Sequence, residues 1–228
     1  MKRQAWALAL TVGLLAAGGA PQAALVPYTS AGVELVYDDD YTPVGASSPG
    51  LTWTADANLA ATMTFGVTGI DPSGTMTWAK ALEWIAGMNT ANYAGANDWR
   101  LWSALNSDGS GPCGPAFDCI NSELGHLFYT EGGLSSSDAI NDSAALTGVF
   151  TNMQNFAYWS GTEGSASSAW VFGTGDGNQA SFNKDGQVSG WAVRPGQIAA
   201  APLPGTALLM ALGFGAMALL RRARRRLW

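Results

Sequence analysis

Residues 158–196 read YWSGTEGSASSAWVFGTGDGNQASFNKDGQVSGWAVRPG. Four short runs in this stretch are rich in aromatic and β-branched residues, and Gly, Ser, Asn and Asp separate them: YWSGT, SAWVFG, QASFN and GWAVRPG. Residues of the first kind favour strands, whereas residues of the second kind favour tight turns. The pattern therefore predicts a glycine-rich antiparallel sheet whose short strands are joined by tight turns.

Two helices are expected upstream of this sheet. In residues 77–89, apolar side chains recur three or four positions apart and share one helical face: Trp78, Leu82, Ile85 and Met88. Residues 122–133 predict a second helix, because Ser122 can cap its first turn and two glycines can end it. Runs at 33–37 and 50–54 predict further strands. Helices early in the chain and a sheet late in it indicate an α+β domain.

The N-terminal residues have the layout of a secretory signal peptide. Lys2 and Arg3 precede an apolar run from Ala5 to Ala17, and small residues follow this run. The run is short for a retained membrane helix, which is the alternative. We therefore expect residues 1–23 to be a signal peptide that directs export.

The C-terminal residues combine three features in a fixed order. A proline motif comes first, formed by Pro202, Leu203, Pro204 and Gly205. An uncharged apolar stretch over 205–220 then predicts a transmembrane helix, and a basic cluster follows it: Arg221, Arg222, Arg224, Arg225 and Arg226. Positively charged flanks stay in the cytoplasm, so the residues between the two chain ends are expected outside it.

This layout resembles the PEP-CTERM sorting signal of Gram-negative bacteria, although Leu203 stands where the name-giving motif has glutamate. The resemblance implies that an exosortase-type enzyme recognises residues 202–228 and cleaves near the proline motif, after a spacer over 198–201. It also implies a precursor anchored in the inner membrane through the C-terminal helix. The processed protein would then reach the periplasm, the cell surface or the extracellular matrix. A permanent C-terminal anchor is the alternative.

The part of the chain that is expected to be exported is strongly acidic. Residues 24–201 contain all 17 Asp and Glu residues and only four basic residues, so their net charge is −13. The four basic residues are Lys80, Arg100, Lys184 and Arg194. Such a surface repels the phosphates of nucleic acids and anionic lipid headgroups. The charge therefore argues against nucleic acid as a partner and favours neutral or cationic ligands.

The chain has two cysteines, Cys113 and Cys119, in the sequence CGPAFDC. A disulfide is the expected state in an oxidising compartment, and Gly114 with Pro115 supplies a turn that lets the two ends meet. A zinc site needs four ligands, and His126 is the single histidine of the sequence. We therefore expect a disulfide, and no catalysis by a free thiol.

Several sequence blocks follow one another in the order seen in one bacterial family: YDDD, GLTWTADAN, MTWAKALEWIAGMN, YAGANDWRL, SELGHLFY, FTNMQNFAYWSGTE, AWVF and WAVRPG. Across residues 35–196 they resemble the Lcl C-terminal domain family, which is named from a collagen-like adhesin. The resemblance implies a C-type-lectin-like fold over residues 24–197. It also implies a binding role, and no cofactor is expected.

Two arginines are candidates for ligand binding. Arg100 and Arg194 each lie in one of these blocks, and a guanidinium could hold a carboxylate or sulfate group through two hydrogen bonds. The alternative, which the many acidic residues favour, is a structural pair with Asp98, Glu83 or Asp56.

Flat aromatic rings can stack on sugar rings or cationic groups. Trp102 and Trp170 are the best surface candidates, because the other tryptophans of the domain lie in the expected helix or at motif positions: Trp78, Trp84, Trp53, Trp99, Trp159 and Trp191. Core packing is the alternative for every tryptophan. The acidic run 38–40 could coordinate Ca²⁺ through its oxygens, but no full ligand loop surrounds it, so a solvated turn is expected and no metal is predicted. His126 is expected to be a packed side chain rather than a catalyst.

These observations predict an exported lectin-like binding module of the cell envelope or the extracellular polysaccharide matrix. Its expected ligand is a glycan or a surface protein. A structural matrix protein without a discrete ligand is the alternative. A hydrolase ranks lower, because no spacing singles out a pair of catalytic carboxylates. No catalytic residue is therefore predicted.

Overall fold

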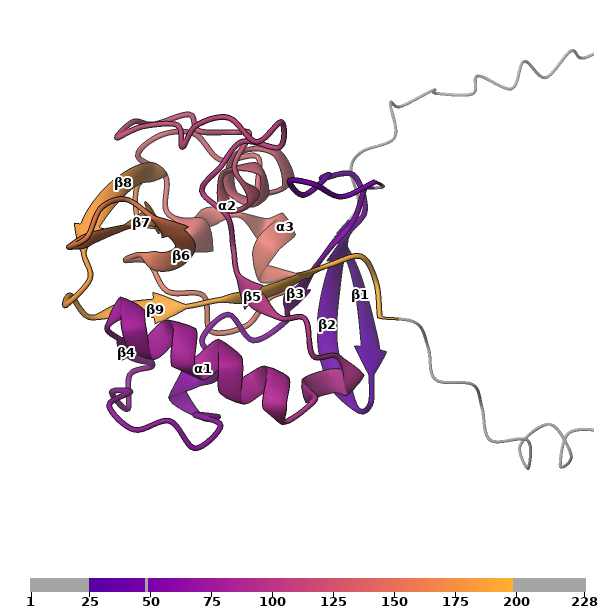
Figure 1. Cartoon of the computed structure of the whole chain (residues 1–228). Coiled ribbons are helices and arrows are strands. Elements are labelled where there is room, and N and C mark those ends of the chain that lie inside the picture. Colours follow the sequence, from indigo (N-terminus) through magenta and orange to yellow (C-terminus); the bar gives the residue numbers. More distant parts are fainter. Residues whose placement is uncertain (1–24, 48, 199–228) are drawn as a thin grey trace, which may run out of the picture.

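The computed structural model describes residues 25–47 and 49–198 (Figure 1). The predicted signal peptide (1–23) and sorting signal (202–228) lie outside the described residues, and so does the transmembrane helix expected over 205–220. Within the described ranges, no helix is long and apolar enough to cross a bilayer. The structure therefore gives no support to the membrane helix in the predicted fold class.

The first sheet has five strands in the order β1-β2-β3-β10-β5, and each neighbouring pair is antiparallel. Its members are β1 (Leu25–Ser30), β2 (Val33–Asp38), β3 (Leu51–Thr54), β10 (Ala192–Pro195) and β5 (Arg100–Leu101). β1 and β2 form a hairpin whose turn residues, Ala31 and Gly32, have φ angles of 49° and 80°. Positive φ at both turn positions matches the twist of the paired strands.

The second sheet also has five strands, in the order β4-β9-β6-β7-β8. They are β4 (Thr75–Met76), β9 (Val188–Gly190), β6 (Tyr158–Glu163), β7 (Ser168–Gly173) and β8 (Asn178–Asn183). β6 and β9 run parallel, whereas the other pairs are antiparallel. Val171 lies opposite Ala180, and Ala169 lies opposite Phe182, so these four residues share one face of the sheet.

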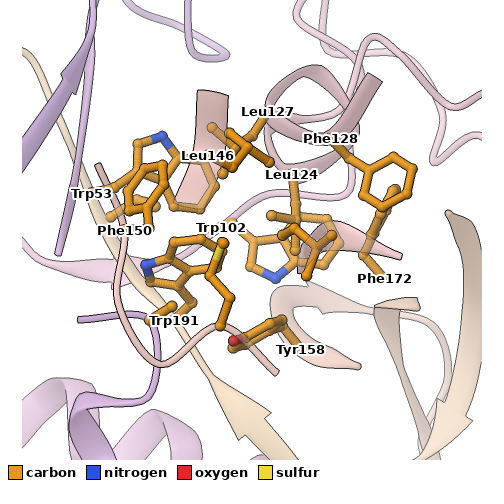
Figure 2. Close-up of a cluster of buried hydrophobic side chains, with 14 of the residues drawn as sticks. Trp53, Trp102, Leu124, Leu127, Phe128, Leu146, Phe150, Tyr158, Phe172 and Trp191 are labelled. Carbon is orange, nitrogen blue, oxygen red and sulfur yellow. The ribbon is translucent and has the colours of Figure 1, made fainter. Parts of the chain in front are cut away.

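One short segment, residues 188–195, belongs to both sheets. Its first part is β9, between β4 and β6, and its last part is β10, between β3 and β5. Trp191 lies at the junction, is fully buried, and donates a hydrogen bond from Nε1 to the Thr54 carbonyl oxygen at 3.0 Å. Its ring packs edge-on against that of Trp53, with centroids 5.0 Å apart (Figure 2). The two sheets therefore meet at a buried pair of tryptophans.

The helix predicted over 77–89 is present as α1 (Trp78–Thr90), and Thr77 caps it by accepting a hydrogen bond from the Lys80 N–H. Its buried face differs from the predicted one, because Trp84 is buried and Leu82 is exposed. The other helical elements are short: η1 (Leu59–Ala61), η2 (Tyr93–Gly95), α2 (Glu123–Gly125), η3 (His126–Glu131), η4 (Ile140–Asp142) and α3 (Ala144–Thr147). η3 is a π-helix, and the other η elements are 3₁₀ helices.

The predicted fold class is wrong. The described residues form a mostly β structure of two five-stranded sheets with three α-helices, rather than an α+β domain of the C-type-lectin-like type with two helices and one antiparallel sheet. The second predicted helix, over 122–133, is a single turn of α-helix followed by a π-helix. Strands β4, β5 and β9 have two or three residues each and are too short to show a periodic pattern.

Two clusters of buried side chains form the interior. The first draws on both sheets and on α2, η3 and α3, and it contains Trp53, Trp102 and Trp191 (Figure 2). The second includes the buried face of α1 and contains Trp84 and Trp159. These five tryptophans are fully buried, so the high tryptophan content of the described residues mainly builds the core.

Candidate functional site

A groove lies on one face of the second sheet and encloses about 370 Å³. Val171 from β7, Ala180 from β8 and Val188 from β9 are among its lining residues. The register of β7 and β8 puts Val171 and Ala180 directly opposite each other on this face. These small apolar side chains give the groove an apolar floor.

Two exposed phenylalanines flank this floor. Phe156, in the loop before β6, is 63% exposed, and Phe182, in β8, is 41% exposed. The Phe182 ring lies against the buried ring of Trp159, with centroids 5.9 Å apart. Trp159 is itself held by a hydrogen bond of 2.8 Å from Nε1 to the Met76 carbonyl oxygen. Phe182 is therefore supported by the core while part of its ring faces solvent.

The groove also carries polar groups that can form hydrogen bonds, from Asn155, Asp176 and Asn178. A carboxylate oxygen of Asp176 accepts a hydrogen bond of 3.0 Å from the Asn178 N–H, which orients the side chain. Gly175 lets its loop approach residue 155 closely, because a Cβ there would lie 2.7 Å from the Asn155 carbonyl oxygen. Asp176 is the single charged residue among the described residues that line the groove.

Sequence patterns mark these residues weakly. Phe182 belongs to the predicted strand QASFN, and alternation places it on the same face as Ala180. Phe156 and Asp176 lie in loops, where no periodic pattern exists. The convergence of these three residues depends on how β6, β7 and β8 pair, which none of the strands specifies alone.

A second groove, of about 480 Å³, contains the predicted candidates Arg100 and Trp102. The guanidinium of Arg100 already has a partner, because its terminal nitrogens donate to both carboxylate oxygens of Glu123 at 2.7 and 2.6 Å. Glu123 also accepts a hydrogen bond of 2.7 Å from the Ser103 N–H. Trp102 is fully buried, so its ring offers no stacking surface. An anionic ligand would have to displace Glu123 from Arg100.

The other two candidates lie apart from this groove. Arg194 donates from Nε and Nη2 to the two carboxylate oxygens of Asp98 at 2.7 and 3.0 Å, which is one of the structural pairs expected as the alternative. Trp170 is partly buried against the first core cluster. Of the four predicted candidates, the structure thus brings together Arg100 and Trp102 in one groove and places Trp170 and Arg194 outside it.

A cluster of ionisable side chains joins the end of β2 to η3. One ligand-type atom from each of Asp38, Asp40, His126 and Glu131 lies within 4.8 Å of all the others. His126 Nε2 lies 3.0 Å from Asp40 Oδ1, 3.4 Å from Glu131 Oε1 and 4.0 Å from Asp38 Oδ2. The run 38–40 is therefore not a uniformly solvated turn, because Asp38 is 1% exposed.

Burial and neighbouring charges shift the pKa values of Asp38 and His126 in this cluster. It raises the pKa of Asp38 to about 7, although the charge of His126 and a hydrogen bond from the Tyr41 N–H act in the opposite direction. Burial lowers the pKa of His126, but its contact with Glu131 and the charges of Asp38 and Asp40 raise it by more. Near neutral pH the Asp38 carboxyl group is therefore partly protonated.

The predicted disulfide between Cys113 and Cys119 is confirmed, with Cα atoms 5.6 Å apart. Gly114 has a φ of 108°, which glycine adopts without a steric penalty, so the chain can close this small loop. Ala116, inside the loop, pairs with Gln179 of β8 in an isolated β-bridge. The disulfide therefore fixes a loop that packs on the second sheet.

No protein-family model matches the chain, and no curated protein matches it. The resemblance to the Lcl C-terminal domain family and to the PEP-CTERM signal therefore stays a prediction. The geometry of the described residues is the basis for the functional proposal.

Proposed function

We propose that this chain is an exported binding module whose ligand is a neutral glycan, held in the groove on the second sheet. The observation that carries the proposal is the pair of exposed phenylalanines, Phe156 and Phe182, beside an apolar floor and a polar rim. Sugar rings have apolar faces of C–H groups and polar edges of hydroxyl groups. The groove offers a matching surface to both.

Stacking supplies the apolar part of this match. An aromatic ring packs well against a flat apolar face, and a ring that the core already holds loses little conformational freedom on binding. Phe182 meets this condition through its contact with Trp159. The amide groups of Asn155 and Asn178 can both donate and accept hydrogen bonds, as sugar hydroxyls require.

Charge favours a neutral ligand over an acidic one. The described residues that line the groove include Asp176 and no Lys or Arg. The span 24–201 has 17 acidic and four basic residues, so the whole surface repels polyanions. A neutral polysaccharide meets no such repulsion.

The same groove argues for binding rather than hydrolysis. Glycoside hydrolases generally need two carboxyl groups that flank the scissile bond. Asp176 is the single carboxylate among the described lining residues. A ligand held there would therefore lack the second catalytic group.

Export is the part of the proposal that rests on the chain ends and on the disulfide. Disulfides persist in oxidising compartments, and Cys113–Cys119 fits that location. The signal peptide over 1–23 and the sorting signal over 202–228 stay predictions, as does processing by an exosortase-type enzyme. A structural matrix protein without a ligand is the rival function.

Glycan binding can be tested by applying the full-length chain to an array of neutral and acidic oligosaccharides and titrating the strongest binder. We expect saturable binding to neutral glycans. Phe156→Ala and Phe182→Ala should each raise Kd by roughly tenfold, since one aromatic contact contributes about 0.5–1.5 kcal/mol beyond the area that it buries.

Phe117→Ala is the matched control, because Phe117 is similarly exposed but lies in the disulfide loop outside the groove. Its Kd should equal that of the wild type. A complete lack of binding across the array would favour the structural role. Binding that both groove variants retain in full would place the ligand elsewhere on the molecule.

A further inference from the structure

We propose that Asp38, Asp40, His126 and Glu131 form a binding site for one divalent first-row transition metal ion, with Zn²⁺ and Mn²⁺ as the best-matched ions. The site is separate from the groove on the second sheet that is proposed to bind a glycan, since none of these four residues lines that groove. It joins two segments that are far apart in the sequence.

The π-helical backbone of η3 creates half of this site. In an α-helix, two residues five positions apart point about 140° away from each other. In a π-helix, hydrogen bonds connect residues five apart, and such residues lie about one turn apart on the same side. The Gly132 N–H bonds to the Leu127 carbonyl oxygen at 2.9 Å in this way. The same geometry brings His126 and Glu131 together, with 3.4 Å between Nε2 and Oε1.

The end of β2 supplies the other half. Asp38 pairs with Leu51 in the sheet, which fixes its backbone. Its Oδ1 accepts a hydrogen bond from the Tyr41 N–H at 3.2 Å, and Oδ2 is left pointing toward His126. Asp40 approaches from the exposed side and places Oδ1 3.0 Å from Nε2.

Two buried carboxylate oxygens in this cluster have no hydrogen-bond partner, which is the observation that points to a cation. They are Oδ2 of Asp38, a residue that is 1% exposed, and Oε1 of Glu131, whose side chain is 3% exposed. A buried polar atom without a partner is costly, and the cost is larger for a charged group. Both atoms face the same small space, where one cation would satisfy them together.

The chemistry of the donors selects the class of ion. Zn²⁺ binds imidazole nitrogen and carboxylate oxygen at about 2.0–2.2 Å in a tetrahedral arrangement, so two ligand atoms lie about 3.3–3.6 Å apart. The separations of 3.4 and 4.0 Å from His126 Nε2 are close to this distance. The 3.0 Å separation from Asp40 Oδ1 is that of a hydrogen bond, which a bound ion would replace. Ca²⁺ prefers six to eight oxygen ligands, and an imidazole nitrogen is a poor substitute for one. A set of three carboxylates and one imidazole suits Zn²⁺ or Mn²⁺ better.

The test is isothermal titration of the full-length chain, without a histidine tag and freed of metal by a chelator, with Zn²⁺, Mn²⁺ and Ca²⁺ in turn. We expect one Zn²⁺ or Mn²⁺ ion per chain and weaker binding of Ca²⁺. Zn²⁺ should also raise Tm. His126→Gln and Asp40→Asn should each raise the Kd for Zn²⁺ by roughly tenfold or more. Loss of a group that only hydrogen-bonds to a metal ligand typically costs about tenfold in affinity, and a direct ligand should contribute at least as much.

Asp40 is exposed, so Asp40→Asn should fold normally, and its Tm in chelator checks this. Asp39→Asn is the matched control, because Asp39 belongs to the same acidic run but not to the cluster. It should bind Zn²⁺ as the wild type does. The proposal is overturned if neither Zn²⁺ nor Mn²⁺ binds, if Ca²⁺ binds more tightly than both, or if His126→Gln and Asp40→Asn bind like the wild type.

Discussion

The pair of Arg100 and Glu123 should stabilise the fold asymmetrically, and the two partners allow a sharp test. Glu123 is 1% exposed at its side chain, whereas Arg100 is 34% exposed. If Arg100 is replaced by methionine, a buried carboxylate keeps just the Ser103 N–H as a partner. If Glu123 is replaced by glutamine, the guanidinium can still turn toward water. Loss of the arginine should therefore cost more than loss of the carboxylate charge.

The expected magnitudes follow from this difference in burial. Breaking a buried ion pair so that one charge remains buried costs about 3–5 kcal/mol, which we assign to Arg100→Met. Glu123→Gln loses charge-assisted hydrogen bonds without burying a lone charge, at about 1.5–3 kcal/mol. For a domain of this size, 1 kcal/mol lowers Tm by about 2–4 °C, so Arg100→Met should lower Tm by roughly 10 °C. Adding Glu123→Gln to Arg100→Met should restore part of the loss.

Urea denaturation at pH 7, followed by tryptophan fluorescence, measures these free energies of unfolding. The exposed pair of Lys80 and Glu83, with the same type of contact at 2.7 Å, is the control. Glu83→Gln should change the free energy of unfolding by at most about 0.5 kcal/mol. Equal losses for Arg100→Met and Glu123→Gln, or a double variant less stable than Arg100→Met alone, would refute the reasoning from burial.

Two further predictions concern the core and a helix start. In urea denaturation, Trp191→Phe should lower the free energy of unfolding by about 1–3 kcal/mol more than Trp53→Phe does. Trp191→Phe removes the hydrogen bond to the Thr54 carbonyl oxygen, whereas the Trp53 Nε1 has no partner to lose. Equal losses for the two variants would contradict the assigned hydrogen bond. Gly125→Ala should lower Tm by roughly 10 °C, because the new Cβ would overlap the Cys119 carbonyl oxygen. A Tm within about 2 °C of the wild type would show that the backbone of this loop shifts at little cost in free energy.

Local patterns predicted the elements that are long enough to show them. The spacing in 77–89 and the cap at Thr77 are physical requirements of a helix, so α1 follows from them. The runs at 33–37 and 50–54 correspond to β2 and β3, because β-branched and aromatic residues favour strands. The hairpin partner β1 was not predicted, because it contains a proline and its turn, Ala31–Gly32, lacks a typical hairpin signal.

Sequence patterns did not predict features that depend on contacts between distant residues or on the hydrogen-bond pattern of a helix. The cap at Ser122 and the two glycines predicted a helix over 122–133, but such signals do not specify its hydrogen-bond pattern, which is that of a π-helix in η3. The partner of Arg100 was also missed. Glu123 is 23 positions away in the sequence, so no local pattern links the two residues, and the tertiary fold brings them together. Phe182 lies at the groove because of the register between β7 and β8, and no local sequence signal specifies this register.

The segment that belongs to both sheets also sets the order of events in folding. β10 is the last strand, yet Val193 pairs with Trp53, and β9 within the same segment pairs with β4 at Met76. Neither sheet can close until these late residues have left the ribosome. Pairings between residues so far apart in sequence carry a large loop-closure entropy and slow the rate-limiting step. A growing chain that lacks residues 188–195 would therefore remain without either complete sheet.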